Sequence, residues 1–366
     1  MQTVLADAWH LGGFSAGRGI GSYLRGVLPL LAQEHDLRLV GLATRETDLP
    51  AGVDYRPIRR IAPNRLAQRE HDFLLPFDLT RAARAEEADV VFSPADNPPR
   101  RSPLPWVQML LDLIPLVVHD RSFRHPAARW RRIGPRLRSA SALLTCSRNT
   151  AADAQRLLDV DPARIHVSPL GIDGRFRPPA DPRCRADRPT LLYVGQYGPH
   201  KGFAEAFAVA AGIADAGLPH RLVMVGFLAP WHEPAVRELV ERSPRPDRID
   251  LLGYVNDVVA AYQGADALLV TSRYEGFCLP AVEAMACGTP VVAFDNSAIP
   301  EVVSGGGILV PDGDVAAAAT ALRGLLEDES YWDEVSERGI EHARAFSWER
   351  CAAMHADVLQ AVATAG

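Results

Sequence analysis

The sequence of 366 residues is poor in lysine. Its 39 basic residues, histidine excluded, are 38 arginines and a single lysine, Lys201. A planar guanidinium and a compact ammonium are not interchangeable at a tight binding site. A lysine retained against this preference for arginine marks position 201 as a candidate binding residue. A lysine side chain that only reaches solvent from the edge of a loop would fit the same observation.

Cysteine is also scarce, and long apolar runs are missing. The five cysteines show neither CxxC spacing nor a neighbouring histidine in metal-ligand register, which predicts reduced thiols and no metal site. No run approaches the roughly 18 apolar residues that span a bilayer, and the start MQTVLADAWH lacks the basic and apolar regions of a signal peptide. We therefore expect a cytoplasmic protein.

Charge is distributed unevenly along the chain. The formal net charge is −6, but residues 1–170 carry +5 and the remainder −11. Residues 121–138 contain seven arginines, with Phe123 and Trp130 among them. Such a run is either a solvated face or a surface for peripheral contact with anionic lipid at the inner membrane face, or for a phosphorylated acceptor. Nucleic acid is not an expected partner of an acidic chain without a recognised binding module.

Short aliphatic runs alternate with helical patterns throughout the chain, which is typical of an α/β protein with parallel sheets. The pattern starts twice, and the length also favours two domains. We predict a first doubly wound domain over 1–172, a proline-rich linker over 173–189, a second doubly wound domain over 190–345, and a last helix over 346–366 that could cross back to the first domain. Ligands of such sheets bind at the carboxyl ends of the strands, so we expect the sites of both domains to face a central cleft.

The lone lysine lies in a loop that follows a predicted strand. The stretch YVGQYGPHKGF covers residues 193–203, and Lys201 is predicted to open the helix that follows. A cation beside the free N–H groups of a helix N-terminus is unfavourable unless an anion lies between them. The loop therefore predicts a phosphate site.

The most specific stretch is SRYEGFCLPAVEAMACGTPVVAF, which places Glu275 and Glu283 around a loop and a helix start. Pro280 suits the first helical turn, where its missing N–H costs nothing, and Glu283 is predicted on that turn. Amides near Cys278 and Leu279 could hold a phosphate, while the carboxylates could accept hydrogen bonds from vicinal hydroxyls. Taken singly, Glu283 is better explained as a helix-dipole residue and Glu275 as a solvated loop acid.

Together, EGFCLPAVE, AMACGTPVVA and IPEVV resemble the E-x7-E region of the retaining glycosyltransferases of family 4, which have the GT-B fold with two Rossmann-like domains. The resemblance covers nearly the whole chain. Within the family, the chain resembles bacterial mannosyltransferases of polysaccharide biosynthesis. Further matching segments, in the family's order, are GRGIGSYLRGVLPLL, MLLDLIPL, VSPLGID, YVGQYGPHKG, LLGYVND and FSWERC.

The resemblance implies roles for individual residues. Lys201 would neutralise the donor diphosphate, Glu283 would hold the ribose hydroxyls, and Glu275 would bind hydroxyls of the donor sugar. The remaining implied donor-binding residues are Gly19, Gln196, Tyr254, Val255, Phe277, Cys278 and Leu279. The resemblance implies no cofactor beyond the nucleotide-sugar donor and no metal.

The sequence departs from the family's pattern at four positions. Gln196 replaces a common arginine, so neutralisation of the diphosphate relies more on Lys201. His200 also stands where arginine is frequent and would be charged only if a phosphate raises its pKa. Cys278 stands where glycine is common, so its backbone angles are in doubt. Leu111 replaces the family's histidine.

Asp112 is a candidate catalytic residue for contact with the acceptor, because it follows a strand predicted to point into the cleft. Capping of the next segment explains it equally well. An alternative alignment places His119 and Asp120 at the family's histidine-aspartate pair, but the residues that follow fit poorly.

The resemblance predicts transfer of a hexose from GDP-mannose or a UDP-sugar, with retention, to a glycan, a lipid-linked acceptor or a natural product. Two alternatives stay open. A nucleotide-sugar 2-epimerase of the same fold would convert the donor without an acceptor. A non-catalytic sugar-nucleotide binding subunit would bind the donor without turnover, and Gln196 and Leu111 leave room for it.

Overall fold

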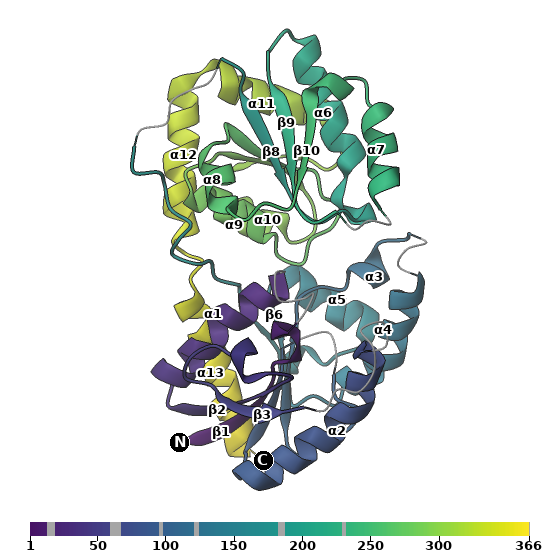
Figure 1. Cartoon of the computed structure of the whole chain (residues 1–366), viewed down its shortest axis with the longest axis vertical. Helices are drawn as coiled ribbons and strands as arrows, with labels where there is room; N and C mark the ends of the chain where they lie inside the picture. The colour runs from purple at the N-terminus through teal and green to yellow at the C-terminus, as the bar shows by residue number, and fades with distance from the viewer. Residues whose placement is uncertain are drawn as a thin grey trace. The chain divides into compact units, whose positions relative to one another are not determined.

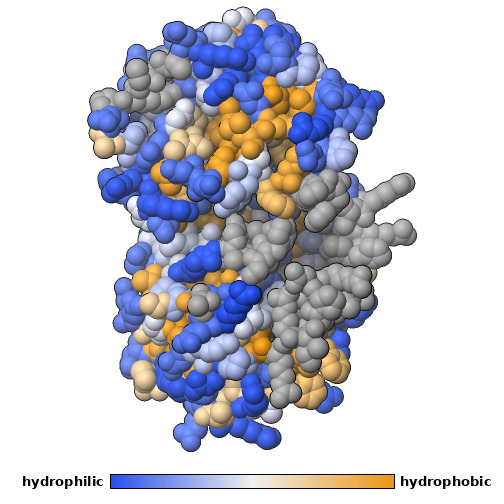
Figure 2. Space-filling model, in the orientation of Figure 1, coloured by the Kyte–Doolittle hydropathy of each residue, from blue (hydrophilic) through white to orange (hydrophobic). Residues whose placement is uncertain are grey.

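The computed structural model describes residues 1–12, 19–58, 67–94, 98–120, 124–181, 187–228 and 232–365. The chain divides into two compact units, one formed by Met1–Gly171 with Phe346–Gly366 and the other by Ile172–Ala345 (Figure 1). Each unit is a parallel sheet wrapped by helices, so the predicted pair of Rossmann-like α/β units is confirmed. Most of the surface visible in Figure 2 is hydrophilic, as expected when apolar strand residues face two cores.

The first unit contains a parallel sheet in the order β3-β2-β1-β4-β5-β6-β7. Its strands are β1 Gln2–Asp7, β2 Leu37–Ala43, β3 Asp54–Pro57, β4 Val90–Ser93, β5 Trp106–Leu110, β6 Ala142–Thr145 and β7 Ile165–Val167. Its helices are α1 Gly19–Glu34, α2 Ala67–Glu86, α3 Ile114–Val117, α4 Arg124–Leu137, α5 Arg148–Leu158 and α13 Trp348–Ala365.

The helices of the first unit cover both faces of its sheet. On one face α2, α4 and α5 contribute apolar side chains, Leu75, Leu79, Trp130, Ile133 and Leu158 among them, to a single core. On the other face α13 packs against α1 and four strands. Figure 1 shows these two helical layers on opposite sides of the sheet.

Helix α13 is held in the first unit by two close approaches. A Cβ at Gly26 would lie 2.2 Å from the Trp348 ring, and one at Gly171 would lie 2.2 Å from the Trp348 main-chain nitrogen. Only glycine allows such contacts without a shift of its neighbours. The sequence left the partner of the last helix open, and these two glycines explain where it packs.

A buried polar cluster also ties α13 to the first unit. The His355 ring contacts the Tyr23 hydroxyl through Nε2 at 2.6 Å and the Ser168 hydroxyl through Nδ1 at 3.1 Å. All three residues are fully buried, so these bonds satisfy groups that would otherwise be costly to bury. Burial lowers the pKa of His355 to about 4, so the ring is neutral near pH 7.

The second unit contains a parallel sheet in the order β10-β9-β8-β11-β12-β13. Its strands are β8 Thr190–Val194, β9 Arg221–Val225, β10 Ile249–Gly253, β11 Ala267–Val270, β12 Val291–Asp295 and β13 Ile308–Pro311. Its helices are α6 Phe203–Asp215, α7 Glu233–Glu241, α8 Val258–Gln263, α9 Leu279–Ala286, α10 Ile299–Val303, α11 Val315–Glu327 and α12 Glu329–Ala343.

The strand order of the second unit reverses between β8 and β11. From β8 the chain adds β9 and β10 on one side, and from β11 it adds β12 and β13 on the other. In open α/β sheets, the crevice outside the carboxyl ends of the strands at such a switch point is the usual ligand site. The loops that follow β8 and β11, which hold Lys201 and Glu275, flank this point.

Residues from the predicted linker pack on the second unit. The Phe176 ring meets the Tyr262 ring at 6.0 Å, and the Arg177 carbonyl accepts a hydrogen bond from the Gln263 amide at 2.8 Å. The described part of 172–189 therefore belongs to the second unit, whereas the sequence predicted a separate connecting segment.

Candidate functional site

Lys201 lies in the loop between β8 and α6. The chain leaves β8 at Val194, forms a 3₁₀ turn over Pro199–Lys201 and enters α6 at Phe203. The prediction that Lys201 itself opens the helix is wrong by two residues. The reason is Gly202, whose φ is +67° and where a Cβ would stand 2.0 Å from the Thr271 carbonyl oxygen.

The ammonium of Lys201 forms an ion pair with Glu275. Its Nζ lies 2.5 Å from Glu275 Oε1, and the side chains are 15% and 10% exposed. The Ser272 hydroxyl donates to the same oxygen at 2.6 Å, and the Glu275 amide donates to Ser297 Oγ at 2.9 Å. Two candidate residues that lie 74 positions apart therefore share one site, in which Ser272 holds the carboxylate and Ser297 holds the main chain of Glu275.

The ion pair keeps Glu275 ionised. Burial alone would raise the pKa of Glu275, but the charge and hydrogen bond of Lys201, with the bond from Ser272, outweigh it and lower that pKa. The carboxylate can therefore only accept hydrogen bonds at neutral pH, as a ligand for hydroxyl groups would.

His200 is neutral in this site. Burial, followed by the neighbouring Lys201 charge, lowers the pKa of His200 to about 4. In this state only Lys201 of the two adjacent residues contributes positive charge near pH 7.

Glu283 lies in α9, which begins at Leu279 with Pro280 in its first turn. The predicted position of Pro280 is confirmed. The prediction that Glu283 lies on the first turn is wrong, because it is the fifth residue of the helix and starts the second turn. Its carboxylate lies toward α8.

The carboxylate of Glu283 is held by Tyr262 of α8. The Tyr262 hydroxyl donates to Glu283 Oε2 at 2.8 Å, and Tyr262 is fully buried. The Thr289 hydroxyl donates to the Tyr262 carbonyl at 2.6 Å, which fixes the main chain there. Burial raises the pKa of Glu283, while the bond from Tyr262 opposes this rise.

Cys278 has the backbone conformation of a glycine. Its φ is +79° and its ψ is 56°, in the left-handed region that non-glycine residues seldom adopt. The backbone takes these angles in spite of the side chain. Such strain is characteristic of functional loops. Phe277 and Cys278 are buried, and Leu279 is half-buried.

Three more candidates lie at the same edge of the second sheet. Gln196 follows β8, and Tyr254 and Val255 follow β10. The ends of these strands meet, since the Gly226 amide after β9 donates to the Gly253 carbonyl at 2.8 Å. Tyr254 is 67% exposed, as a residue whose contact with a base runs through main-chain atoms can be.

Gly19 and Asp112 belong to the first unit. Gly19 is the first residue of α1, and residues 13–18 before it lie outside the described part of the chain. Asp112 follows β5, and its Oδ1 accepts a hydrogen bond from the Ile114 amide at 3.0 Å. The capping explanation of Asp112 is thus observed, while its contact with an acceptor stays a prediction. His119 and Asp120 are exposed and lie beyond α3.

The sequence patterns predicted no role for Tyr262, Ser272 and Ser297, the residues that hold the two glutamates. Ser272 was within reach, because it follows the end of β11 and stands three residues before Glu275. Tyr262 gave no signal, since an aromatic residue in an apolar helix usually serves the core.

The segment Asp312-Gly313-Asp314 is a D-x-D sequence directly after β13, where metal-binding carboxylates can occur. Asp314 instead caps α11 through a bond from the Ala317 amide at 2.9 Å, and Asp312 accepts from the Asn296 amide at 2.5 Å. Within the described ranges, no group of three or more histidine, cysteine, aspartate or glutamate side chains is placed to hold a metal ion.

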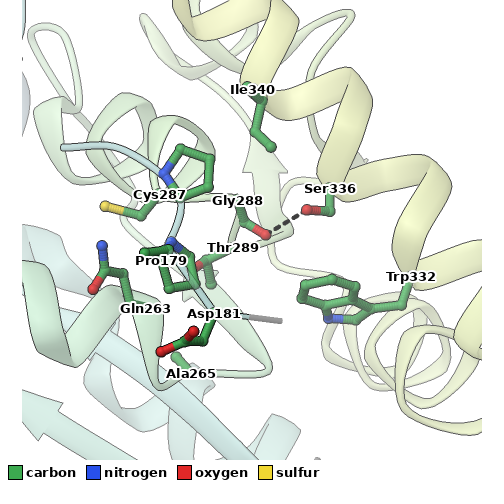
Figure 3. A pocket seen from close by; sticks show the side chains of 12 residues that line it. Pro179, Asp181, Gln263, Ala265, Cys287, Gly288, Thr289, Trp332, Ser336 and Ile340 are labelled. Carbon is green, nitrogen blue, oxygen red and sulfur yellow. Dashed lines mark hydrogen bonds between the residues drawn. The ribbon is translucent and has the colours of Figure 1, made fainter. Parts of the chain in front are cut away.

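A pocket of about 340 Å³ lies elsewhere in the second unit (Figure 3). Its wall includes Ala265 before β11 and Thr289 before β12, so it lies where strands begin, opposite to the edge that carries Lys201. Figure 3 shows Trp332, Ser336 and Ile340 of α12 on one side, and Ser336 donates to the Gly288 carbonyl at 2.6 Å. This pocket is separate from the candidate site.

None of the helices in the described part of the chain combines the length and apolar character that a membrane crossing needs. Of the predicted basic surface over 121–138, residues 121–123 lie outside the described part. Residues 124–137 form α4, whose Arg131 and Arg132 are exposed while Trp130 is buried in the core. Trp130 therefore does not belong to the predicted surface.

Two family models match the chain. Residues 17–175 match the model of Glycosyltransferase Family 4, and residues 179–346 match the model of Glycosyl transferases group 1. Together they cover both units.

Among curated proteins, the chain is similar to the O-antigen chain mannosyltransferase B of Escherichia coli. The two are 31% identical over 228 residues, which are 59% of this chain and 59% of that protein. The chain thus spans about three fifths of the length of this relative.

Among solved structures, the sucrose-phosphate synthase of Thermosynechococcus elongatus has a TM-score of 0.78 at 21% identity and covers all of both chains. The HepE protein of Anabaena in complex with UDP and glucose has a TM-score of 0.72 at 18% identity, over 98% of this chain and 99% of that chain. At these identities the likeness concerns the fold.

Proposed function

Because the chain belongs to the glycosyltransferases of family 4 and group 1, with two Rossmann-like domains, we propose that it transfers a hexose from a nucleotide-diphosphate sugar with retention at the anomeric carbon. The proposal rests on the switch point of the second sheet, where the lone lysine pairs with the buried Glu275 in the loop that leads to α9, the helix that carries the half-buried Glu283. Its donor is GDP-mannose or a UDP-sugar. A mannosyltransferase relative supports the first, and a structural neighbour that holds UDP and glucose supports the second.

Lys201 is proposed to stabilise the leaving diphosphate. A preorganised cation in a water-poor site stabilises charge that develops on a leaving group without reorganisation. The pairing with Glu275 fixes the position of the ammonium before the donor arrives. No metal is required for this step, and the N–H groups near Gly19 and at the start of α9 add to the stabilisation.

Glu275 and Glu283 are proposed to accept hydrogen bonds from hydroxyls of the sugar and of the ribose. Ser272 orients the first carboxylate, Ser297 fixes the main chain of Glu275, and Tyr262 orients the second carboxylate. Orientation of the donor is the expected role of Glu275, with attack by the acceptor from the side of the leaving group. Asp112 is proposed to contact the acceptor, which is a glycan, a lipid-linked or a natural-product acceptor.

The protein is proposed to act in the cytoplasm, with peripheral contact to the inner membrane face through 121–138. Its part in polysaccharide biosynthesis is supported by the name of the mannosyltransferase relative.

Thermal shift with GDP, UDP and ADP sugars tests the donor. A ligand at 100 times its dissociation constant adds about 2.7 kcal/mol to the free energy of unfolding, which a melting curve resolves. NMR of the product's anomeric proton then reports retention. Conversion of the donor without any acceptor would favour a 2-epimerase, and binding without turnover over a broad acceptor panel would favour a non-catalytic subunit.

A further inference from the structure

One asparagine connects the ends of three strands of the second sheet. Asn296 directly follows β12, and its side-chain amide donates to the Ser272 carbonyl after β11 at 2.9 Å and to Asp312 Oδ1 after β13 at 2.5 Å. Its amide oxygen accepts a hydrogen bond from the Ser297 hydroxyl at 3.0 Å. An asparagine amide offers two N–H donors and one acceptor oxygen, so the whole polar end of this side chain is used.

These bonds hold both ends of the segment 272–275 in the loop between β11 and α9. At its start, the Ser272 carbonyl accepts from Asn296. At its end, the Glu275 amide donates to the Ser297 hydroxyl, which donates in turn to Asn296. The Ser272 hydroxyl also donates to the Glu275 carboxylate. The position of Glu275 therefore depends on Asn296 through two serines.

The opposite side of the same segment is fastened to the loop of Lys201. The Arg273 amide donates to the His200 carbonyl at 2.7 Å. Just before the segment, the Thr271 hydroxyl donates to the Gly202 carbonyl at 2.7 Å. The segment thus lies between the lysine loop on one side and the asparagine on the other, and release of either side would change the distance between the ammonium and the carboxylate.

The main chain of Ser297 is strained at this point. Its φ is +48°, in the left-handed region that a serine seldom adopts. In this conformation its hydroxyl lies between Asn296 Oδ1 and the Glu275 amide. Strained residues of this kind persist where the surrounding contacts determine them, and they cluster at functional sites.

We propose that Asn296 is a positioning residue of the candidate site, which acts through Ser272 and Ser297 to hold Glu275 where its carboxylate meets Lys201. The two hydrogen bonds that fix the ends of segment 272–275 carry the proposal. The effect of Asn296 on donor binding rests on the proposed function, whereas its effect on the ion pair does not.

The single lysine gives a readout of the ion pair that needs no donor. Protein labelled with ¹⁵N-lysine contains one labelled ammonium, that of Lys201, so its NMR signal reports on the pair with Glu275 without overlap. Ammonium protons in a closed, buried pair exchange slowly with water, and opening of the pair speeds their exchange. In Asn296→Asp the ionised new carboxyl cannot donate to the Ser272 carbonyl, so the Lys201 signal should broaden or vanish at pH 8.

The pH dependence of Asn296→Asp separates positioning from a general loss of stability. The new carboxyl faces the Asp312 carboxylate and a carbonyl oxygen, so its pKa should be raised, and once protonated it can donate a hydrogen bond again. Relative to the wild type at the same pH, the variant should bind a nucleotide-sugar about tenfold more weakly at pH 8, from loss of the hydrogen bonds of Asn296. At pH 5 this difference should narrow, and the Lys201 signal should sharpen.

An exchanged variant and a matched control complete the experiment. Asn296→Asp combined with Asp312→Asn keeps the formal net charge of the wild type and removes the contact between two carboxyls, so it should lose most of the pH dependence of the single variant. Asp314→Asn changes an aspartate of the same loop whose side chain caps α11. This control should match the wild type in donor affinity and in the Lys201 signal.

An unchanged Lys201 signal in Asn296→Asp would overturn the proposal, even if the melting temperature falls, because Asn296 would then serve stability alone. Equal pH dependence in the single and the exchanged variant would overturn it as well. A wild-type ammonium that already exchanges fast would do the same, since the pair would be open with Asn296 in place. If no nucleotide-sugar binds the wild type, the proposed function fails, and the Lys201 signal alone still decides the role of Asn296.

Discussion

Removal of the Tyr262 hydroxyl isolates one bond in the candidate site. The change Tyr262→Phe keeps the ring, which packs beside Phe176, and deletes only the 2.8 Å hydrogen bond to Glu283 Oε2. Hydrogen bonds to charged groups contribute about 1.5–3 kcal/mol, which corresponds to about tenfold to a hundredfold in binding. We expect KM for the donor to rise by about this factor while kcat changes less than about threefold, because Tyr262 touches neither Lys201 nor Glu275.

The pH profile provides a second readout. The bond from Tyr262 lowers the pKa of Glu283 against the effect of burial, so its loss lets that pKa rise further. A carboxylate that must be ionised to accept two hydroxyls loses function as the pH falls through its pKa. The acid limb of donor binding should therefore move to higher pH in Tyr262→Phe.

Two further variants make the experiment decisive. Tyr23→Phe removes the 2.6 Å hydrogen bond between the fully buried Tyr23 hydroxyl and His355 in the first unit. This variant should lower the free energy of unfolding by a similar amount, about 1.5–3 kcal/mol, and leave KM for the donor unchanged. In a Glu283→Gln background, Tyr262→Phe should add little, because the charge that the hydroxyl stabilises is gone. If Tyr262→Phe lowers kcat alone, or shifts neither KM nor the acid limb, the assignment of Tyr262 to the position of Glu283 is refuted.

Three other variants test other parts of the structure. Lys201→Ala removes the cation of the site and should lower kcat at least about a hundredfold, from the roughly 3 kcal/mol that one preorganised stabiliser contributes; unchanged turnover would remove the basis of the proposed mechanism. Gly202→Ala should destabilise the second unit by at least about 1–2 kcal/mol in urea denaturation, because its φ of +67° disfavours a Cβ and the Thr271 carbonyl blocks one; wild-type stability would contradict this close approach. His355 has a pKa of about 4, below its usual 6.5, so the folded state binds fewer protons than the unfolded state. The contribution of His355 to the free energy of unfolding is therefore complete above pH 6.5 and falls by about 3 kcal/mol between pH 6.5 and pH 4. His355→Gln should flatten that slope in denaturation curves, whereas Gln at the exposed His166 should leave it as in the wild type.

The sequence predicted the elements well where periodicity and turn residues agree. The helix predicted after the Lys201 loop is α6, and Pro280 marked the start of α9. The two errors at the site are shifts along the chain. Lys201 precedes α6 by two residues because Gly202 adopts a left-handed turn, and Glu283 lies one residue beyond the first turn of α9 because the helix begins at Leu279.

The pairing of Lys201 with Glu275 could not be read from the residues alone. It depends on β8 lying next to β11, two strands separated by β9 and β10 in the chain, and strand order is a property of the folded sheet. The bond of Tyr262 to Glu283 likewise needs α8 beside α9. Local patterns identify which residues are unusual, whereas tertiary packing decides which of them meet.

The packing of α13 has a consequence for the order in which the chain can fold during synthesis. The stretch Ile172–Ala345 is continuous and can complete its core once it has left the ribosome. The first unit is synthesised earlier, yet the groove at Gly26 stays unfilled until Trp348 emerges, and Tyr23 lacks its hydrogen-bond partner until His355 emerges. The amino-terminal half must therefore wait for the last helix, and a fragment that stops at Gly171 would expose the apolar surface that this helix covers.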